Sequence, residues 1–155
     1  MPNPDPVDFA KLIPELTAWN NGSGISIEAW TGCVGNIELA IGYSQLFWPD
    51  FIEHDGCVLF ADFSPQSYQA FLEQCEGDRR RVETVMNHRH VFDYFCDLSQ
   101  SATHDQLIYI GRMLKEMWRA KLNLDFPARA FVFSFPEGPF EDVIDYEVTF
   151  WQKLP

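Results

Sequence analysis

A long amphipathic helix is the clearest element that the sequence predicts. Over residues 103–122, large apolar side chains recur at spacings of three and four, as they do on one face of an α-helix. Thr103 and Gln106 stand three positions apart ahead of this stripe, which is the pattern of a capping box at a helix N-terminus. Because the apolar face of such a helix must be buried, we expect the helix to cover a sheet formed elsewhere in the chain.

Four other stretches carry patterns typical of β-strands. Residues near 25–30 alternate apolar and polar side chains, whereas residues near 57–62 are mostly apolar, as in a strand covered on both faces. Residues 129–135 and 143–151 alternate as well. We expect these last two to pair as an antiparallel hairpin with a long loop.

The remaining apolar patterns predict helices, and Ser64 and Asp78 are expected to cap two of them. Pro14 interrupts the first of them, so that helix either kinks or starts again at the proline. Arg79 and Glu83 lie four residues apart on a later one and are expected to form a surface ion pair. The prediction is an α+β fold: one small, mainly antiparallel sheet of about four strands, with four to five helices in a single layer. Residues 7–155 would form a single domain after a flexible tail, residues 1–6.

The total charge restricts the classes of partner. The chain has 23 acidic and 11 basic side chains, which gives a formal charge of -12. This charge repels phosphate backbones and anionic lipids, so we expect neither nucleic acid nor a membrane as partner, and a basic protein surface as the favoured one. The alternative, that the charge only keeps the protein in solution, stays open. No secretory signal or long apolar span is evident and the four cysteines are scattered singly, so we expect a cytoplasmic protein with reduced thiols.

The first candidate site is an acidic turn between a predicted helix and a predicted strand. Asp50, Glu53, His54 and Asp55 place four metal-binding or proton-transfer groups within six residues. Carboxylate oxygens suit Mg²⁺ or Ca²⁺, and imidazole suits Zn²⁺ or another transition metal. The spacing of a calcium-binding loop is absent, as is a His-Glu-x-x-His motif. An ordinary acidic turn is therefore the simpler interpretation.

The second candidate site is the segment with His88, Arg89, His90 and Asp93. On an extended backbone the two histidines would share a face and could bind one ion, but on a helix they diverge by about 200°. If a helix ran through this segment, Arg89 would lie within its apolar stripe. Either the helix breaks near residues 87–90, or Arg89 is buried and pairs with Asp93. We favour a helix here, which argues against a metal site made by this pair alone.

Two functions are compatible with these features. The first is a non-enzymatic protein-interaction module, of the kind that inhibitors and immunity proteins represent, because the chain is acidic and aromatic-rich and has no complete catalytic motif. The alternative is a metal-dependent or acid–base enzyme that uses the two candidate segments together. No cofactor motif is evident, and a divalent metal is the cofactor that these side chains would suit. For such a metal the candidate ligands are His54, His88 and His90, which the fold would have to bring together.

Overall fold

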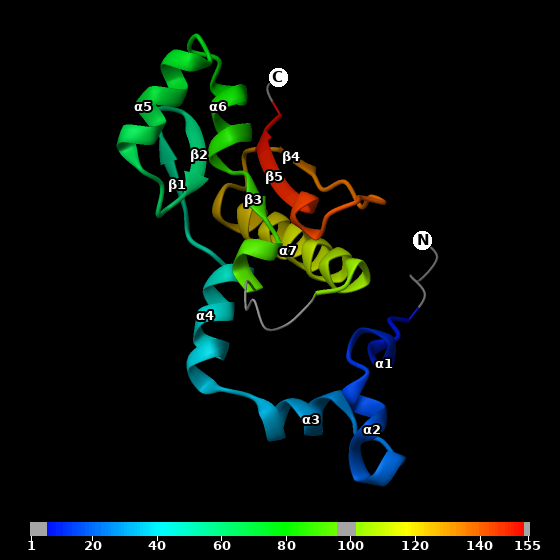
Figure 1. Ribbon diagram of the computed structural model, residues 1–155. Coiled ribbons are helices and arrows are strands. Elements are labelled where there is room, and N and C mark those ends of the chain that lie inside the picture. Colours follow the sequence, from blue (N-terminus) through cyan, green and yellow to red (C-terminus); the bar gives the residue numbers. More distant parts are fainter. Residues whose placement is uncertain (1–5, 96–101, 154–155) are drawn as a thin grey trace. The chain divides into compact units, whose positions relative to one another are not determined.

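The computed structural model describes residues 6–95 and 102–153 (Figure 1). In this part of the chain, seven α-helices and two small antiparallel sheets confirm the predicted α+β class. The chain divides into two compact units, residues up to Tyr43 and residues from Ser44 onward. That residues 7–155 act as one domain stays a prediction. The predicted tail, residues 1–6, lies almost wholly outside the described residues, as do Cys96 and residues 97–101.

The first unit consists of short helices: α1 (Phe9–Leu12), α2 (Glu15–Gly22), α3 (Ile27–Val34) and the first part of α4 (Ile37–Phe47). Asp8 caps α1 through its side chain, which accepts hydrogen bonds from the next turn. A new helix then starts directly after Pro14, because proline fits the start of a helix but not its interior. Of the two alternatives for this stretch, the structure therefore contains the restarted helix.

The prediction of a strand near residues 25–30 is wrong, because most of these residues belong to helix α3. The Ser26 side chain accepts a hydrogen bond from the Ala29 amide, and Glu28 lies in the positively polarised first turn of the helix. Alternation over only six residues was a weaker signal than this cap. In α4, Ile37 and Ile41 stay exposed, at 76% and 63%. These two side chains of the α4 apolar stripe therefore lie on the surface of the described chain.

The second unit begins with a two-stranded hairpin, β1 (Phe51–His54) and β2 (Cys57–Phe60). Asp55 and Gly56 connect the strands, and both have positive φ angles, as a two-residue type I′ turn requires. Strand β2 is fully buried, in agreement with its apolar pattern. Strand β1 was not predicted, although Asp-Gly between apolar stretches is a recognised hairpin signal.

Two capped helices follow the hairpin. Ser64 caps α5 (Pro65–Gln74), and Asp78 caps α6 (Arg79–Met86), both as predicted. Helix α6 ends before the histidines: β3 (Arg89–His90) and a 3₁₀ helix (Phe92–Phe95) come next. The prediction that we favoured, a helix through residues 88–93, is therefore wrong. The other resolution of the Arg89 conflict, a break near residues 87–90, is confirmed.

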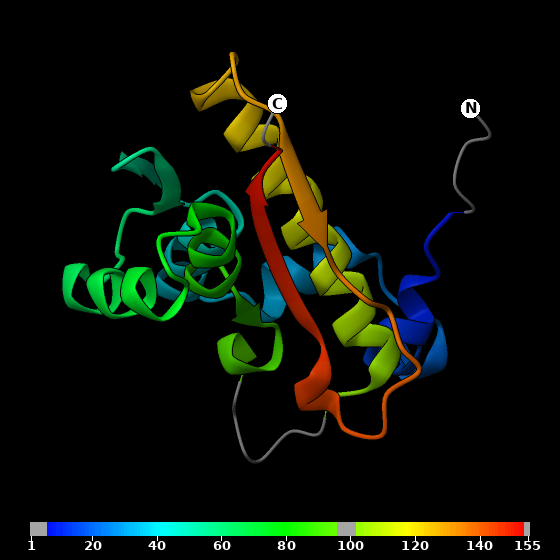
Figure 2. The ribbon, with the colours of Figure 1, turned by 90° about the horizontal axis from the view of Figure 1, so that it is seen from above.

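The second sheet has the strand order β3-β5-β4, with all strands antiparallel. Strands β4 (Phe131–Ser134) and β5 (Glu147–Gln152) form the predicted hairpin, and a 3₁₀ helix (Val143–Asp145) lies in its loop. Helix α7 (His104–Asp125) has the predicted capping box and runs alongside β4 and β5 (Figure 2). Its apolar face and the sheet enclose the larger core, which includes Trp118, Leu114, Val148 and Phe150. Among the described residues, none of the helices has both the length and the apolar character needed to cross a bilayer.

Two buried polar side chains, one in α6 and one at its C-cap, join the two sheets. The Glu83 carboxylate accepts hydrogen bonds from the backbone amides of Val58 in β2 and Gln152 in β5, both at 2.7 Å. The Asn87 amide donates to the carbonyl oxygens of Val58 and Phe150. The prediction of a surface ion pair between Arg79 and Glu83 is thus wrong. Glu83 is only 1% exposed, and its carboxylate accepts hydrogen bonds from backbone amides. Helical spacing placed Glu83 near Arg79 but carried no information about burial.

Candidate functional site

The outer edge of β1 carries backbone groups that face away from β2. Both backbone polar groups of Val58 bond to α6 side chains, so they face away from β1. Glu53 lies directly opposite Val58 in the antiparallel ladder, and its N–H and C=O must therefore face away from β2. The same alternation turns the N–H and C=O of Phe51 outward. Among the described strands β1 pairs with β2 alone, which leaves these four groups as an open edge.

Exposed carboxylates surround this hairpin. Asp50 precedes β1 and Asp62 follows β2, and their side chains are 79% and 84% exposed. Glu53 projects from β1, and Asp55 lies in the turn. The cations nearest to Asp50 and Asp62 are Lys121 and Arg89, at 3.9 and 3.8 Å, whereas Glu53 forms a 2.6 Å ion pair with Arg129. Ion pairs at such long distances with exposed carboxylates contribute little, so Asp50 and Asp62 remain accessible to another cation.

His54 lies at the end of β1 and packs against aromatic rings of the second unit. Its ring centroid is 4.9 Å from that of Phe63 and 4.7 Å from that of Tyr68. Its Nε2 atom is 3.7 Å from an Asp55 oxygen. Among the described residues, one group of side chains has ligand atoms close enough together to hold a metal ion. No residue of the 50–55 turn belongs to that group. The structure thus gives His54 a packing role beside the acidic turn.

One member of each candidate segment lines a common cavity. The cavity has a volume of about 310 Å³, and its walls include Asp50, Arg89 and Tyr94. The Arg89 guanidinium donates to the carbonyl oxygens of Met86 and His88 and lies 4.4 Å from the centroid of the Phe60 ring. Its charge is therefore already satisfied mainly by the protein itself. Asp93, the predicted partner of Arg89, is the exposed residue of the 3₁₀ helix that follows β3.

The two remaining predicted residues, His88 and His90, come together with Glu147. His88 precedes β3, and His90 lies directly opposite Glu147 in the pairing of β3 with β5. The rings of His88 and His90 have centroids 4.6 Å apart, and His88 Nε2 is 2.7 Å from a Glu147 oxygen. Glu147 was missed because the sequence does not reveal which residue of β5 lies opposite His90. The extended backbone that we considered but did not favour is what unites the two histidines.

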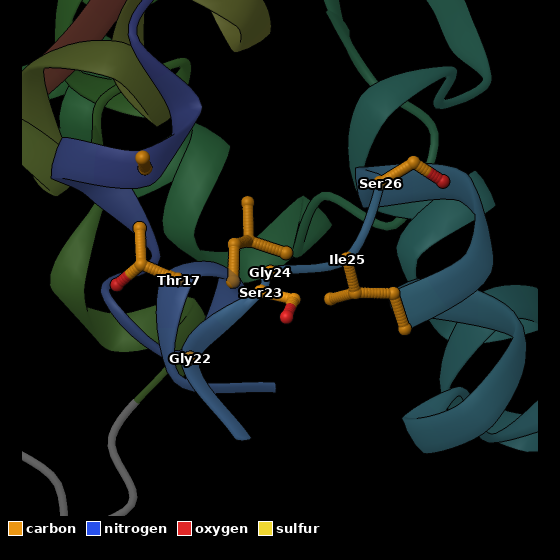
Figure 3. A pocket seen from close by; sticks show the side chains of 8 residues that line it. Thr17, Gly22, Ser23, Gly24, Ile25 and Ser26 are labelled. Carbon is orange, nitrogen blue, oxygen red and sulfur yellow. The ribbon is translucent and has the colours of Figure 1, made fainter. Parts of the chain in front are cut away.

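A hollow in the first unit has a volume of about 520 Å³ and is bordered by the glycine-rich connection between α2 and α3 (Figure 3). Glycine-rich loops bind phosphate through free backbone amides. Here the amides of Ser23, Gly24 and Ile25 donate to the carbonyl oxygens of Asn20, Trp19 and Leu16, respectively. The donors that a phosphate would need are therefore in use, and the loop serves as a connector.

We expect the described cysteines to differ strongly in their reactivity toward iodoacetamide. Cys33 is exposed on α3, whereas Cys57 and Cys75 are buried. Burial, together with the negative charge of Glu83, raises the pKa of the Cys57 thiol, so the reactive thiolate forms only at a more alkaline pH. Peptide mass spectrometry after brief labelling of the native protein should find Cys33 modified and Cys57 unmodified. Equal labelling of the two would contradict the burial of β2.

Comparison with family models, with curated proteins and with solved structures gave no match.

Proposed function

We propose that the protein is a non-enzymatic interaction module that binds an extended, basic segment of a partner protein along β1. The observation that carries the proposal is the open edge of β1, with the outward N–H and C=O groups of Phe51 and Glu53. An exposed strand edge can accept a further strand, which then bonds through its backbone. The edge itself would thus supply binding free energy that does not depend on the partner's side chains.

The charge around the edge favours a basic partner segment. Asp50 and Asp62 flank the hairpin, Glu53 and Asp55 belong to it, and the whole chain carries a charge of -12. Such a field attracts a cationic segment at long range and disfavours an acidic one. Lysine or arginine side chains of the added strand would displace the long contacts of Asp50 and Asp62 with the chain's own cations. Because these contacts are weak, their loss would offset little of the gain.

The test uses a fluorescent peptide that alternates lysine or arginine with valine, and measures its binding by anisotropy at low and physiological salt. We expect saturable binding that weakens as salt screens the charges. An acidic peptide of the same length and valine positions should not bind. A basic peptide that fails to bind at low salt would overturn the proposal.

Two variants separate the edge from the charge. Glu53→Pro removes an outward N–H and leaves the β1–β2 ladder intact, since proline is tolerated at a position whose N–H faces solvent. Glu53→Gln removes the carboxylate charge and keeps the N–H. We expect the proline variant to lose at least ten times more affinity than the glutamine variant. Equal losses would indicate attraction by charge alone and would contradict strand addition.

A further inference from the structure

A second feature of the same unit, independent of the β1 edge, has its own chemistry. We propose that His88, His90 and Glu147 form a binding site for a divalent transition-metal ion, with Zn²⁺ as the best match. Each of these side chains offers one ligand atom, and the three atoms lie within 4.8 Å of one another. All three residues are partly exposed, so an ion can reach them from solvent.

The hydrogen bond of His90 sets the tautomer that metal binding needs. The Nδ1 atom of His90 is 2.8 Å from the Ile144 carbonyl oxygen. A carbonyl can only accept, so Nδ1 must carry the hydrogen, and Nε2 of the neutral ring keeps its lone pair. Metal-binding histidines commonly donate their second ring N–H to a backbone carbonyl, which orients the ring and raises its basicity as a ligand. His90 already has this arrangement.

The distances suit a tetrahedral ion after a small adjustment. Zinc bonds of about 2.0–2.1 Å to nitrogen and oxygen place tetrahedral ligand atoms roughly 3.3 Å apart. His88 Nε2 and the Glu147 oxygen, which are 2.7 Å apart in a direct contact, would separate slightly. The two ligand atoms that lie farthest apart, within 4.8 Å, would move closer together. Partly exposed side chains can make both movements by rotation about their own bonds.

The ligand set selects among metals. Two imidazoles and one carboxylate favour zinc, copper or nickel over Mg²⁺ and Ca²⁺, which prefer a shell of oxygen atoms. Three protein ligands leave the fourth tetrahedral position open to water or to a group from a partner. The acidic charge of the whole chain further favours a cation here.

The test is a calorimetric titration of untagged protein with ZnCl₂ at neutral pH, repeated with variants that keep the local hydrogen bonds. His90→Asn keeps a donor for the Ile144 carbonyl but loses the Nε2 ligand. His88→Gln keeps a donor toward Glu147 but loses the imidazole. We expect one Zn²⁺ per chain for the natural protein and a loss of affinity of at least about 100-fold in each variant. Loss of a residue that only supports a metal ligand costs up to about 100-fold, and loss of the ligand itself should cost at least as much.

His54→Gln provides the matched control, because His54 is also partly exposed and lies beside a carboxylate. Its affinity for Zn²⁺ should stay within about twofold of the natural protein. Circular dichroism of all variants establishes that they are folded. Absence of binding, unchanged affinity in the His88 and His90 variants, or loss of affinity in the His54 variant would each overturn the proposal.

Discussion

Replacing Glu83 with alanine is expected to lower the free energy of unfolding by about 3–5 kcal/mol. The substitution leaves the amides of Val58 and Gln152 without their acceptor, in a region where Glu83 itself is almost completely buried. Each buried donor without a partner costs about 1–3 kcal/mol. The loss should be measured by urea denaturation, followed by circular dichroism.

Glu83→Gln refines this prediction. The glutamine oxygen can still accept one amide, but its NH₂ group would face a donor, so we expect a smaller loss than for alanine. Glu73→Ala provides the control, because Glu73 is an exposed carboxylate on the neighbouring helix α5. It should change the unfolding free energy by less than about 0.5 kcal/mol. A Glu83→Ala protein as stable as the Glu73→Ala protein would contradict the role of Glu83 as the link between the sheets.

Replacing Trp118 with alanine is expected to have an effect of similar size, about 3–5 kcal/mol. Trp118 is 0% exposed, its ring packs edge-on against Phe60 at 4.9 Å, and its Nε1 donates to the Leu46 carbonyl oxygen. Alanine would remove the largest fully buried side chain of the core between α7 and the sheet. Far-UV circular dichroism during urea denaturation measures the loss without relying on tryptophan fluorescence.

Trp118→Phe isolates the hydrogen bond from the packing. Phenylalanine fills most of the space but leaves the Leu46 carbonyl without this donor, so we expect a loss of about 1–3 kcal/mol. Trp48→Ala is the control, because 40% of Trp48 already lies in water. If Trp118→Ala lowered the free energy of unfolding no more than Trp48→Ala does, Trp118 could not be part of the core.

The parts of the fold that the sequence predicted are those with local causes. Ser64, Asp78 and Thr103 mark helix starts because their side chains accept hydrogen bonds from the amides three residues ahead. The β4–β5 hairpin follows from alternation on both sides of one loop. The errors concern short stretches: residues 25–30, where a helix cap outweighed alternation, and β1 and β3, which are too short to show a clear period.

The candidate site divides in the same way. The carboxylates of the 50–55 turn were found because they are neighbours in sequence. The open edge of β1 was not, because it depends on α6 side chains occupying the other side of β2. Glu147 lies 59 residues from His88, and only the register of β3 against β5 brings them together. Turn geometry fixes the register only of strands that one hairpin connects, and β3 and β5 are not connected in this way.

The most direct test of the interaction proposal is amide hydrogen exchange along β1, with and without the basic valine-containing peptide. In the free protein, the outward amides of Phe51 and Glu53 should exchange rapidly, while those of Ile52 and His54, which face β2, should be protected. Saturating peptide should then protect Phe51 and Glu53. Protection of these two amides in the free protein, or unchanged rapid exchange in the presence of bound peptide, would contradict the proposal that β1 receives a partner strand.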